Sequence, residues 1–309
     1  RLYRLYLYNK MDKIINSNNS NYLKYIISPI TPYFICDHHF STEIYKGDYK
    51  YIDIDINGLL NENTNDLYLN KNFDKIKEGD IIQVQVDLFN LFVNDILPKI
   101  SCKITIFTSQ WHLPALCKNE ITDKCLEDEK IILWISQNPI YENHNKYMAF
   151  PYGLRHTTLN PYMNFVKHNY KKIFDIDTKT NLCFNSPFQC GINILGHHIR
   201  RDPIFNNVRG KILPYDNYLN NILKSKFTIS TSGDRDDCYR HYECIGLNSI
   251  PISNINYKEI FGNNMIYSNI DEILKNINGE VDTNFYFTDK KFLLIDYWRD
   301  KILLRLKNN

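Results

Sequence analysis

Short runs of β-branched and aromatic residues alternate with helix-like segments along most of this chain. The clearest strand-like runs are 81–86, 103–108, 130–136, 146–150, 182–185, 227–230 and 250–253. Segments with apolar residues at helical spacing lie between or after these runs, at 89–97, 218–223, 237–247, 270–277 and 291–306. Strands separated by helices indicate βα units, so the sequence predicts an α/β fold with mainly parallel sheets.

The pattern divides into two Rossmann-like halves, separated by a basic, polar and helix-like segment at 155–182. A chain of 309 residues is long enough for two domains. We therefore expect an N-terminal domain over residues 11–157, with further strands at 25–30 and 51–56, and a C-terminal domain over 158–291. A C-terminal helix within 292–309 is expected to pack back on the first domain.

The charges nearly balance, with 37 Lys and Arg residues against 35 Asp and Glu. A net charge of +2 gives no electrostatic reason to expect nucleic acid or an anionic membrane as partner. The apolar runs are too short to span a bilayer, and Arg1–Lys10 lacks the apolar core of a signal peptide. We therefore expect a soluble, cytoplasmic protein with no membrane span, unless an upstream segment carries an anchor.

The eight cysteines include no pair with CxxC spacing, and several stand inside apolar stretches. This usage is typical of buried thiols in a reducing compartment, and a zinc site would need closely spaced ligand pairs that the sequence lacks. Asn, Ile, Tyr and Lys are abundant while Ala is nearly absent. That bias indicates a low-GC genome, as in some bacteria, protists and large DNA viruses, rather than a function.

The segment 223–253 holds the most informative pattern. A strand at 227–230 is followed by the small polar residues Thr231, Ser232 and Gly233, by a capping Asp236 or Asp237, by a helix to residue 247 and by a second strand. A loop of small residues at a helix start exposes backbone N–H groups that suit a phosphate. In open α/β sheets ligands bind beyond the carboxyl ends of the strands, which is where this loop is predicted to lie.

Arg240 and Glu243 are three residues apart and share one face of the predicted helix. The arginine can neutralise a diphosphate, and the carboxylate can accept both hydroxyls of a ribose. An Arg–Glu pair on the surface of an ordinary helix is the alternative.

This segment resembles the nucleotide-sugar signature of exostosin-like glycosyltransferases, which have the two-domain GT-B fold. The residues that carry the resemblance are Ser225-Lys226-Phe227, Gly233, Arg240, Glu243 and Ser249-Ile250-Pro251-Ile252. The family usually has Gly where Asn248 stands, and Asn is the commonest other residue in the left-handed region of backbone space. The resemblance implies that Arg240 meets the diphosphate and Glu243 the ribose, in a cleft between the two domains.

Weaker similarities to the same family lie elsewhere in the chain. Pro151-Tyr152-Gly153-Leu154 resembles a turn at the end of the N-terminal half, and 297–302 resembles the closing helix of the fold. Arg200-Arg201 resembles a basic element that reaches phosphate in relatives, so Arg201 joins Ser232 and Gly233 as a predicted donor-binding residue.

The general base that accepts the proton of the attacking hydroxyl is not fixed by any motif. Asp37 and His112 lead as candidates because each follows a run predicted as a strand. His38, His39 and Asp87 are further candidates, and each of the five also has a plain interpretation as a loop or cap residue.

Three Asp-x-Asp strings, at 53–55, 175–177 and 234–236, match the manganese-holding string of the other large glycosyltransferase fold, GT-A. Such strings are common by chance, and the first lies in an alternating strand. We expect no metal and no cofactor, with the leaving diphosphate stabilised by Arg240 and a helix N-terminus.

The resemblance thus implies a glycosyltransferase that moves a sugar from a nucleoside diphosphate, UDP- or GDP-linked, to a hydroxyl of a glycan, protein or small molecule, with inversion and without metal. Two alternatives from other classes stay open. One is an epimerase-like enzyme of the same fold that alters the nucleotide sugar without an acceptor, and the other is a non-catalytic binding or structural protein.

Overall fold

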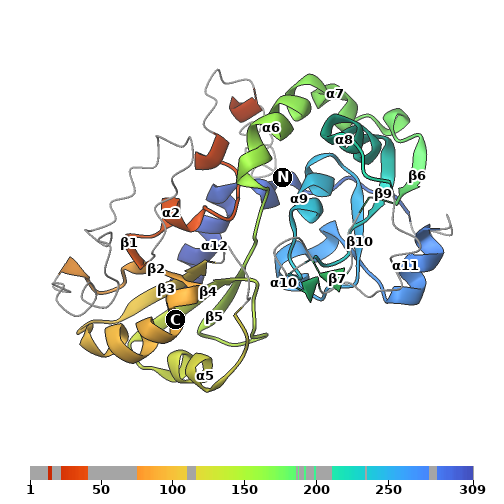
Figure 1. Ribbon diagram of the computed structural model, residues 1–309. Coiled ribbons are helices and arrows are strands. Elements are labelled where there is room, and N and C mark those ends of the chain that lie inside the picture. The colour runs from red at the N-terminus through yellow and green to blue at the C-terminus, as the bar shows by residue number, and fades with distance from the viewer. Residues whose placement is uncertain are drawn as a thin grey trace. The chain divides into compact units, whose positions relative to one another are not determined.

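The computed structural model describes residues 13–15, 22–40, 75–109, 116–185, 187, 191–192, 198–199, 211–233, 235–277 and 284–308. The chain divides into two compact units, which Figure 1 shows with their helices and strands. The N-terminal unit comprises Pro29–Phe150 and Trp298–Asn309, and the C-terminal unit comprises Arg1–Ser28 and Pro151–Tyr297. This division differs from the predicted one, because residues 22–28 group with the C-terminal unit and the chain changes units after Phe150 rather than after residue 157.

Within its described residues, the N-terminal unit has a five-stranded parallel sheet with its strands in chain order. The strands are β1 (His38–Phe40), β2 (Ile81–Gln85), β3 (Ile104–Ser109), β4 (Ile131–Gln137) and β5 (Tyr147–Phe150). The runs predicted at 81–86, 103–108, 130–136 and 146–150 are therefore confirmed as strands. The predicted strand at 25–30 is wrong: Ile26 forms only an isolated antiparallel bridge with Leu294. The predicted strand at 51–56 lies outside the described residues.

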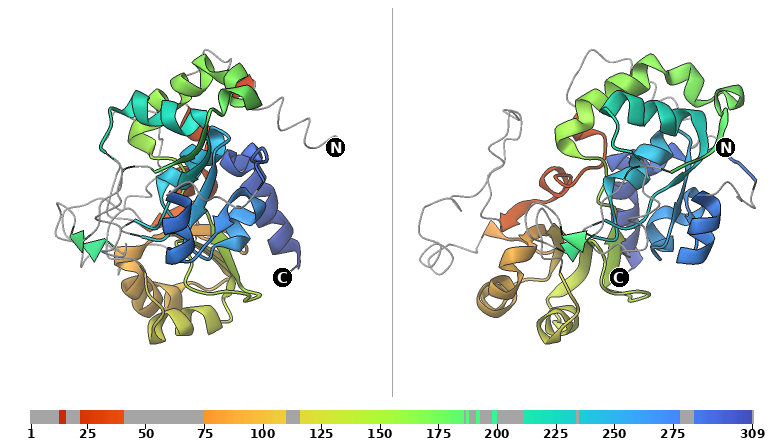
Figure 2. Two further views of the ribbon diagram at one scale, coloured as in Figure 1. Left: turned by 90° about the vertical axis from the view of Figure 1, so that its right-hand side faces the viewer. Right: turned by 45° about the vertical axis from the view of Figure 1, so that its right-hand side comes forward.

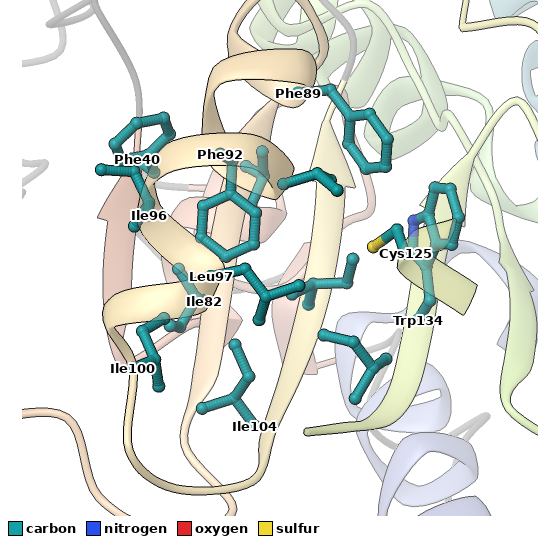
Figure 3. Packing of buried hydrophobic residues seen from close by; sticks show 14 of the residues in the cluster. Phe40, Ile82, Phe89, Phe92, Ile96, Leu97, Ile100, Ile104, Cys125 and Trp134 are labelled. Carbon is teal, nitrogen blue, oxygen red and sulfur yellow. The ribbon is translucent and has the colours of Figure 1, made fainter. Parts of the chain in front are cut away.

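The connections after β2 and β3 lie on one face of this sheet. Because each new strand is added on the same side of the last, right-handed crossovers must place both connections together. After β2 comes a helical stretch of changing pitch, and after β3 comes α5 (Glu120–Glu127), which the side chain of Asn119 caps. The stretch consists of η3 (Val86–Leu88), α4 (Phe89–Leu91), η4 (Phe92–Ile96) and η5 (Leu97–Lys99). Phe92 and Ile96 of this stretch pack over Ile82 and Ile104 of the strands (Figure 3).

The opposite face of the same sheet meets α12 (Ile295–Asn308) from Trp298 onward (Figure 2). The Trp298 ring lies 5.5 Å from that of Phe150, which in turn contacts Phe107 of β3. Arg305 donates to the carbonyl oxygen of His144 at 2.8 Å. The predicted C-terminal helix is thus present, and its last part covers the sheet of the N-terminal unit.

The C-terminal unit contains, within its described residues, a four-stranded parallel sheet in the order β11-β10-β9-β6. Its strands are β6 (Asn181–Phe184), β9 (Ser225–Ile229), β10 (Ile250–Ser253) and β11 (Ile266–Tyr267). The crossover helices are α8 (Tyr215–Lys224), α9 (Tyr239–Gly246) and α10 (Lys258–Phe261). Figure 1 shows α9 and α11 (Ile270–Ile277) on opposite sides of β10, and Ile273 of α11 packs on Phe227 and Ile252. Two parallel sheets with helices confirm the predicted α/β class.

Shorter elements complete the description. They are η1 (Tyr22–Lys24), α2 (Pro32–Ile35), η6 (His156–Thr158), α6 (Leu159–His168), α7 (Tyr170–Ile173), η7 (Ile176–Thr178), β7 (Gly191–Ile192), β8 (His198–Ile199), η9 (Gly262–Asn264) and η10 (Lys290–Leu293). The strands β7 and β8 pair antiparallel. The predicted helical connection after residue 155 corresponds to α6 and α7.

The turn Pro151–Leu154 directly follows β5 and opens the C-terminal unit's second segment. Gly153 has φ +89°, and a Cβ there would lie 2.5 Å from the backbone of Ile27 and Ser28. Leu154 donates its N–H to the carbonyl of Ile27 at 2.9 Å. A glycine is required here twice, for its positive φ and for the close approach of two backbones.

Candidate functional site

The loop Thr231–Gly233 leaves the carboxyl end of β9, as the sequence predicts. Ser230 extends the ladder by donating its N–H to Ile252 O at 2.9 Å, after which the chain turns away from the sheet. Two of the predicted phosphate-binding N–H groups are used internally: Ser232 N–H donates to Asn254 Oδ1 at 3.2 Å and Gly233 N–H to Arg235 O at 2.8 Å. The hydroxyl Oγ1 of Thr231 is buried and has no hydrogen-bond partner among the described residues.

The helix after this loop begins later than predicted. Cys238 holds the cap position with extended backbone and no side-chain cap bond, so the prediction of Asp236 or Asp237 as cap is wrong. Asp237 is instead fully buried, and its Oδ2 accepts from the backbone N–H of Tyr152 at 2.7 Å and from the Tyr242 hydroxyl at 2.5 Å. The Asp237 carboxyl group therefore does not cap the helix. It connects the Pro151–Leu154 turn to α9 through hydrogen bonds to Tyr152 and Tyr242.

Arg240 and Glu243 do share a face of α9, and both meet α8. The two oxygens of Glu243 accept hydroxyl donors from Tyr215 at 2.9 Å and Tyr218 at 2.7 Å. Arg240 donates from Nε to the Tyr218 hydroxyl at 3.3 Å and from Nη2 to the carbonyl oxygen of Pro187. The Nη1 group of Arg240 is buried without a hydrogen-bond partner in the described part of the chain.

Burial controls the electrostatics of this pair. It raises the pKa of Glu243, which is 6 % exposed, although the hydroxyls of Tyr218 and Tyr215 and the charge of Arg240 oppose the rise. Burial also lowers the pKa of Arg240, but neighbouring groups, Tyr218 foremost, more than offset this, so that the net shift is upward. Arg240 therefore stays a fixed positive charge, and that charge, with the two tyrosine hydroxyls, limits the rise in the pKa of Glu243.

His241 lies between Arg240 and Glu243 in the sequence and contacts residues on both sides of the Thr231–Gly233 loop. It is fully buried, with Nδ1 2.7 Å from the Ser230 hydroxyl and Nε2 3.2 Å from the carbonyl oxygen of Asp236. A carbonyl only accepts, so Nε2, which also lies 3.5 Å from Cys238 Sγ, carries a proton, and in the neutral ring Nδ1 then accepts from Ser230. This arrangement fixes both ends of the loop on α9.

Asn248 has φ 55°, so its backbone lies in the left-handed region, where Asn is the commonest residue after glycine. Its side chain also has a role that the sequence did not indicate. Nδ2 donates to Ile173 O at 2.7 Å, while Oδ1 accepts from the Thr288 hydroxyl at 2.8 Å and the Lys290 amine at 2.5 Å. Asn248 thus joins three segments behind the site.

Lys179 is a further residue that sequence reasoning missed, because no motif marks it. Its amine donates to Leu223 O at 2.7 Å and Leu247 O at 2.8 Å, at the carboxyl ends of α8 and α9. Burial lowers the pKa of Lys179 to about 7. The Lys179 side chain thereby provides hydrogen-bond donors for carbonyl oxygens at the ends of both helices that carry site residues.

The base candidates lie mainly in the N-terminal unit. Asp37 precedes β1 and does not follow a strand; its Oδ2 accepts from Ile81 N–H at 2.9 Å, at the amino ends of the strands. His38 contacts Asp80 at 2.8 Å. The Nδ1 atom of His39 lies 2.7 Å from Gln83 Oε1, within a buried polar row that continues to Ser109. Asp87 accepts from the Gln85 amide at 2.9 Å.

Several predicted residues lie outside the described part of the chain. These are His112, Arg200, Arg201, Asp53, Asp55 and Asp234. In the string at 175–177, Asp175 accepts from the N–H of Asp177 at 3.0 Å and so caps η7. Among the described residues, no three His, Cys, Asp or Glu side chains stand close enough to hold a metal ion. No described helix is long and apolar enough to cross a membrane.

Comparison with known proteins adds no family: no protein-family model matches the chain, and no curated protein is significantly similar to it. The geometry therefore carries the functional argument alone. Thr231, Ser232 and Gly233 follow the carboxyl end of β9, and Arg240 and Glu243 lie on the next helix, α9, where both contact α8.

Proposed function

We propose that the chain is a GT-B glycosyltransferase that uses a nucleoside diphosphate sugar, UDP- or GDP-linked. The donor would bind in the C-terminal unit and the acceptor hydroxyl in the N-terminal unit. The observation that carries this proposal is the buried Nη1 group of Arg240, which lacks a hydrogen-bond partner among the described residues. A buried guanidinium N–H without a partner is costly, and a phosphate oxygen satisfies it with a charge-assisted bond.

Each site group has a role in this proposal. Arg240 and the Thr231 hydroxyl would contact the diphosphate, and the N–H groups of Ser232 and Gly233 would exchange their internal partners for it. A carboxylate has about four lone-pair sites, of which the two tyrosines use two at Glu243. The remaining two can accept the ribose hydroxyls.

The reaction would be an inverting displacement. The acceptor oxygen attacks the anomeric carbon, and the bond from that carbon to the phosphate oxygen breaks, with its electron pair leaving on the nucleoside diphosphate. Arg240 and the loop stabilise the charge that develops there. The acceptor proton would pass to a general base of the N-terminal unit. Of the two leading sequence candidates, Asp37 lies at the amino ends of the strands, away from the edge where ligands bind, and His112 lies outside the described residues. Donor recognition and leaving-group stabilisation need no metal in this scheme.

A thermal-shift screen tests the proposal with UDP, GDP, CMP, TDP and their common sugars, each with EDTA or with manganese. A ligand at 100 times its dissociation constant should raise the melting temperature by about 5 to 10 °C through mass action. Arg240→Ala should abolish the rise, whereas Arg299→Ala, which removes an arginine bonded to a carbonyl oxygen in the N-terminal unit, should preserve it.

The outcomes separate the alternatives. A rise in melting temperature with nucleotide in the presence of EDTA supports a metal-independent donor site. A rise that occurs only with manganese favours a metal site at one of the Asp-x-Asp strings. Incubation of the donor with the protein alone, followed by NMR, identifies an epimerase if the sugar changes without an acceptor. No rise with any nucleotide contradicts the proposal.

A further inference from the structure

The side chain of Tyr218 links the two charged residues of the candidate site. Its hydroxyl donates to Glu243 Oε2 at 2.7 Å and accepts from Arg240 Nε at 3.3 Å. The guanidinium carbon of Arg240 lies 6.0 Å from the centre of the Tyr218 ring, within the outer range of a cation–π contact. One tyrosine therefore touches both groups, through its hydroxyl and through its ring.

Helix geometry explains why this residue is available. Tyr215 and Tyr218 are three apart on α8, as Arg240 and Glu243 are on α9, so each helix presents two residues on one face. The two tyrosine rings stack with centroids 6.1 Å apart. Tyr215 donates to Glu243 at 2.9 Å, and the Nε–H of Arg240 donates to the hydroxyl oxygen of Tyr218. The chain thus offers a matched pair of tyrosines on Glu243, of which Tyr218 also holds the arginine.

Arginine is costly to order because its long side chain has many rotamers. The bonds from Nε to Tyr218 and from Nη2 to Pro187 already fix the plane of the guanidinium, while Nη1 has no hydrogen-bond partner among the described residues. A ligand that binds Nη1 therefore meets an arginine whose ordering cost is already met within the fold.

We propose that Tyr218 is a positioning residue for the anion site: its hydroxyl holds Arg240 beside Glu243 so that the nucleoside diphosphate binds a preformed pair. This inference rests on the proposed function, since it names the residue that orders the donor site. Tyr218 acts through Arg240 and Glu243, and it need not touch the ligand itself.

The test is a double-mutant cycle on nucleotide affinity, measured by calorimetry with whichever of UDP or GDP stabilises the unaltered protein. Tyr218→Phe keeps the ring and removes only the hydroxyl, so it should weaken binding about 10-fold, while Tyr215→Phe should weaken it less than about 3-fold. In an Arg240→Lys background, which lacks the Nε–H donor, the additional effect of Tyr218→Phe should fall to less than about 3-fold. Melting curves without ligand establish that each variant folds.

Each result bears on a different statement. If the unaltered protein binds neither nucleotide, the proposed function fails and this inference falls with it. If it binds and Tyr218→Phe binds equally well, only the positioning role is overturned. If Tyr218→Phe causes the same loss of affinity with and without the Arg240→Lys change, Tyr218 acts through the fold and not through Arg240, which also overturns the role. If Tyr218→Phe fails to fold, Tyr218→4-aminophenylalanine provides a second variant. Its amino group has the reach of the hydroxyl and can still donate to Glu243 but is a poor acceptor for Arg240 Nε–H, so it should also weaken binding, and unchanged affinity would overturn the role.

Discussion

At the scale of single residues, buried polar groups hold the candidate site together. Asp237 fixes the turn before α6 to α9, Lys179 joins the carboxyl ends of α8 and α9, and Glu243 is bound by two tyrosines. Such groups are expensive to bury, and their hydrogen bonds are what makes them tolerable. A change at any one of them should therefore act on folding as well as on ligand binding.

Asp237 should make stability fall with rising pH. Burial raises its pKa from an ordinary 3.8 to about 7, so between these values the folded state keeps a proton that the unfolded state has released. The stability that this proton provides is fully present below pH 4 and is lost as the pH passes through 7. Asp237→Asn cannot titrate, so the unaltered protein should lose about 4 kcal/mol relative to it between pH 4 and pH 8.

Urea unfolding of both proteins across this pH range measures the difference directly, because every other titrating group is common to the two. Asn keeps a carbonyl oxygen for the Tyr152 N–H and the Tyr242 hydroxyl, so the variant should fold. A difference that stays constant with pH would contradict a raised pKa at Asp237.

Asn248 shows how far residue-level prediction reaches. We expect a left-handed backbone at this position from the sequence, because Asn tolerates that region best after glycine. The structure confirms φ 55°. The bonds from its amide to Ile173, Thr288 and Lys290 could not be predicted, because they join residues up to 75 positions away in sequence.

At the scale of elements, the sequence predicted strands and helices correctly where the apolar pattern extended over several residues. The prediction was wrong where a polar side chain bonds to a residue far away in the sequence. The strands β2, β3, β4, β9 and β10 are buried along most of their length and are rich in β-branched residues, which is typical of parallel sheets. The start of α9 was misplaced because Asp237 bonds to Tyr152 and Tyr242 instead of capping. β1 was missed because His38–Phe40 is short and has no periodicity.

Gly246 ends α9, and its replacement by Ala should destabilise the protein despite the higher helix propensity of Ala. A Cβ at this position would lie 2.0 Å from the Tyr162 hydroxyl oxygen and 3.1 Å from a methyl carbon of Leu293. Tyr162 is buried and donates to Glu243 O at 3.2 Å, so it has little room to retreat. We expect Gly246→Ala to cost about 2 kcal/mol, where propensity alone would give a gain of about 1 kcal/mol.

A suppressor variant identifies the cause. Tyr162→Phe removes the oxygen that the new methyl group would strike, so Gly246→Ala should cost at least about 1 kcal/mol less in that background. Chemical unfolding of the four proteins in this cycle gives the coupling. An additive result would mean that the hydroxyl of Tyr162 is not the obstacle.

At the scale of the whole molecule, the chain forms two compact units, each with its own parallel sheet. The N-terminal sheet packs an aromatic and aliphatic cluster under the helical stretch and α5. In the C-terminal unit one apolar cluster lies between the sheet and α11, and α6, α8 and α9 contribute further buried apolar residues. The charged pair of the candidate site belongs to the C-terminal unit alone. The sequence predicted two halves and assigned the pair to the second. It did not predict that residues 22–28 group with that half, because this grouping depends on contacts between residues far apart in the chain, such as Ile27 and Leu293.

This separation predicts where a nucleotide should slow hydrogen exchange. A ligand that binds only the folded state protects the segments that must open for its release, so UDP or GDP should protect Thr231–Gly233, α9 and α8 most strongly. The strands β3 and β4 belong to the N-terminal unit and should exchange at unchanged rates, which makes them an internal control. Mass spectrometry of exchanged peptides from one sample measures both regions at once.

In Arg240→Ala the protection should vanish from α9 and α8 together, because Tyr218 of α8 accepts a hydrogen bond from the guanidinium of Arg240 on α9. Protection confined to β1–β5 would instead place the nucleotide in the N-terminal unit and contradict the assignment of the donor site to Arg240 and Glu243.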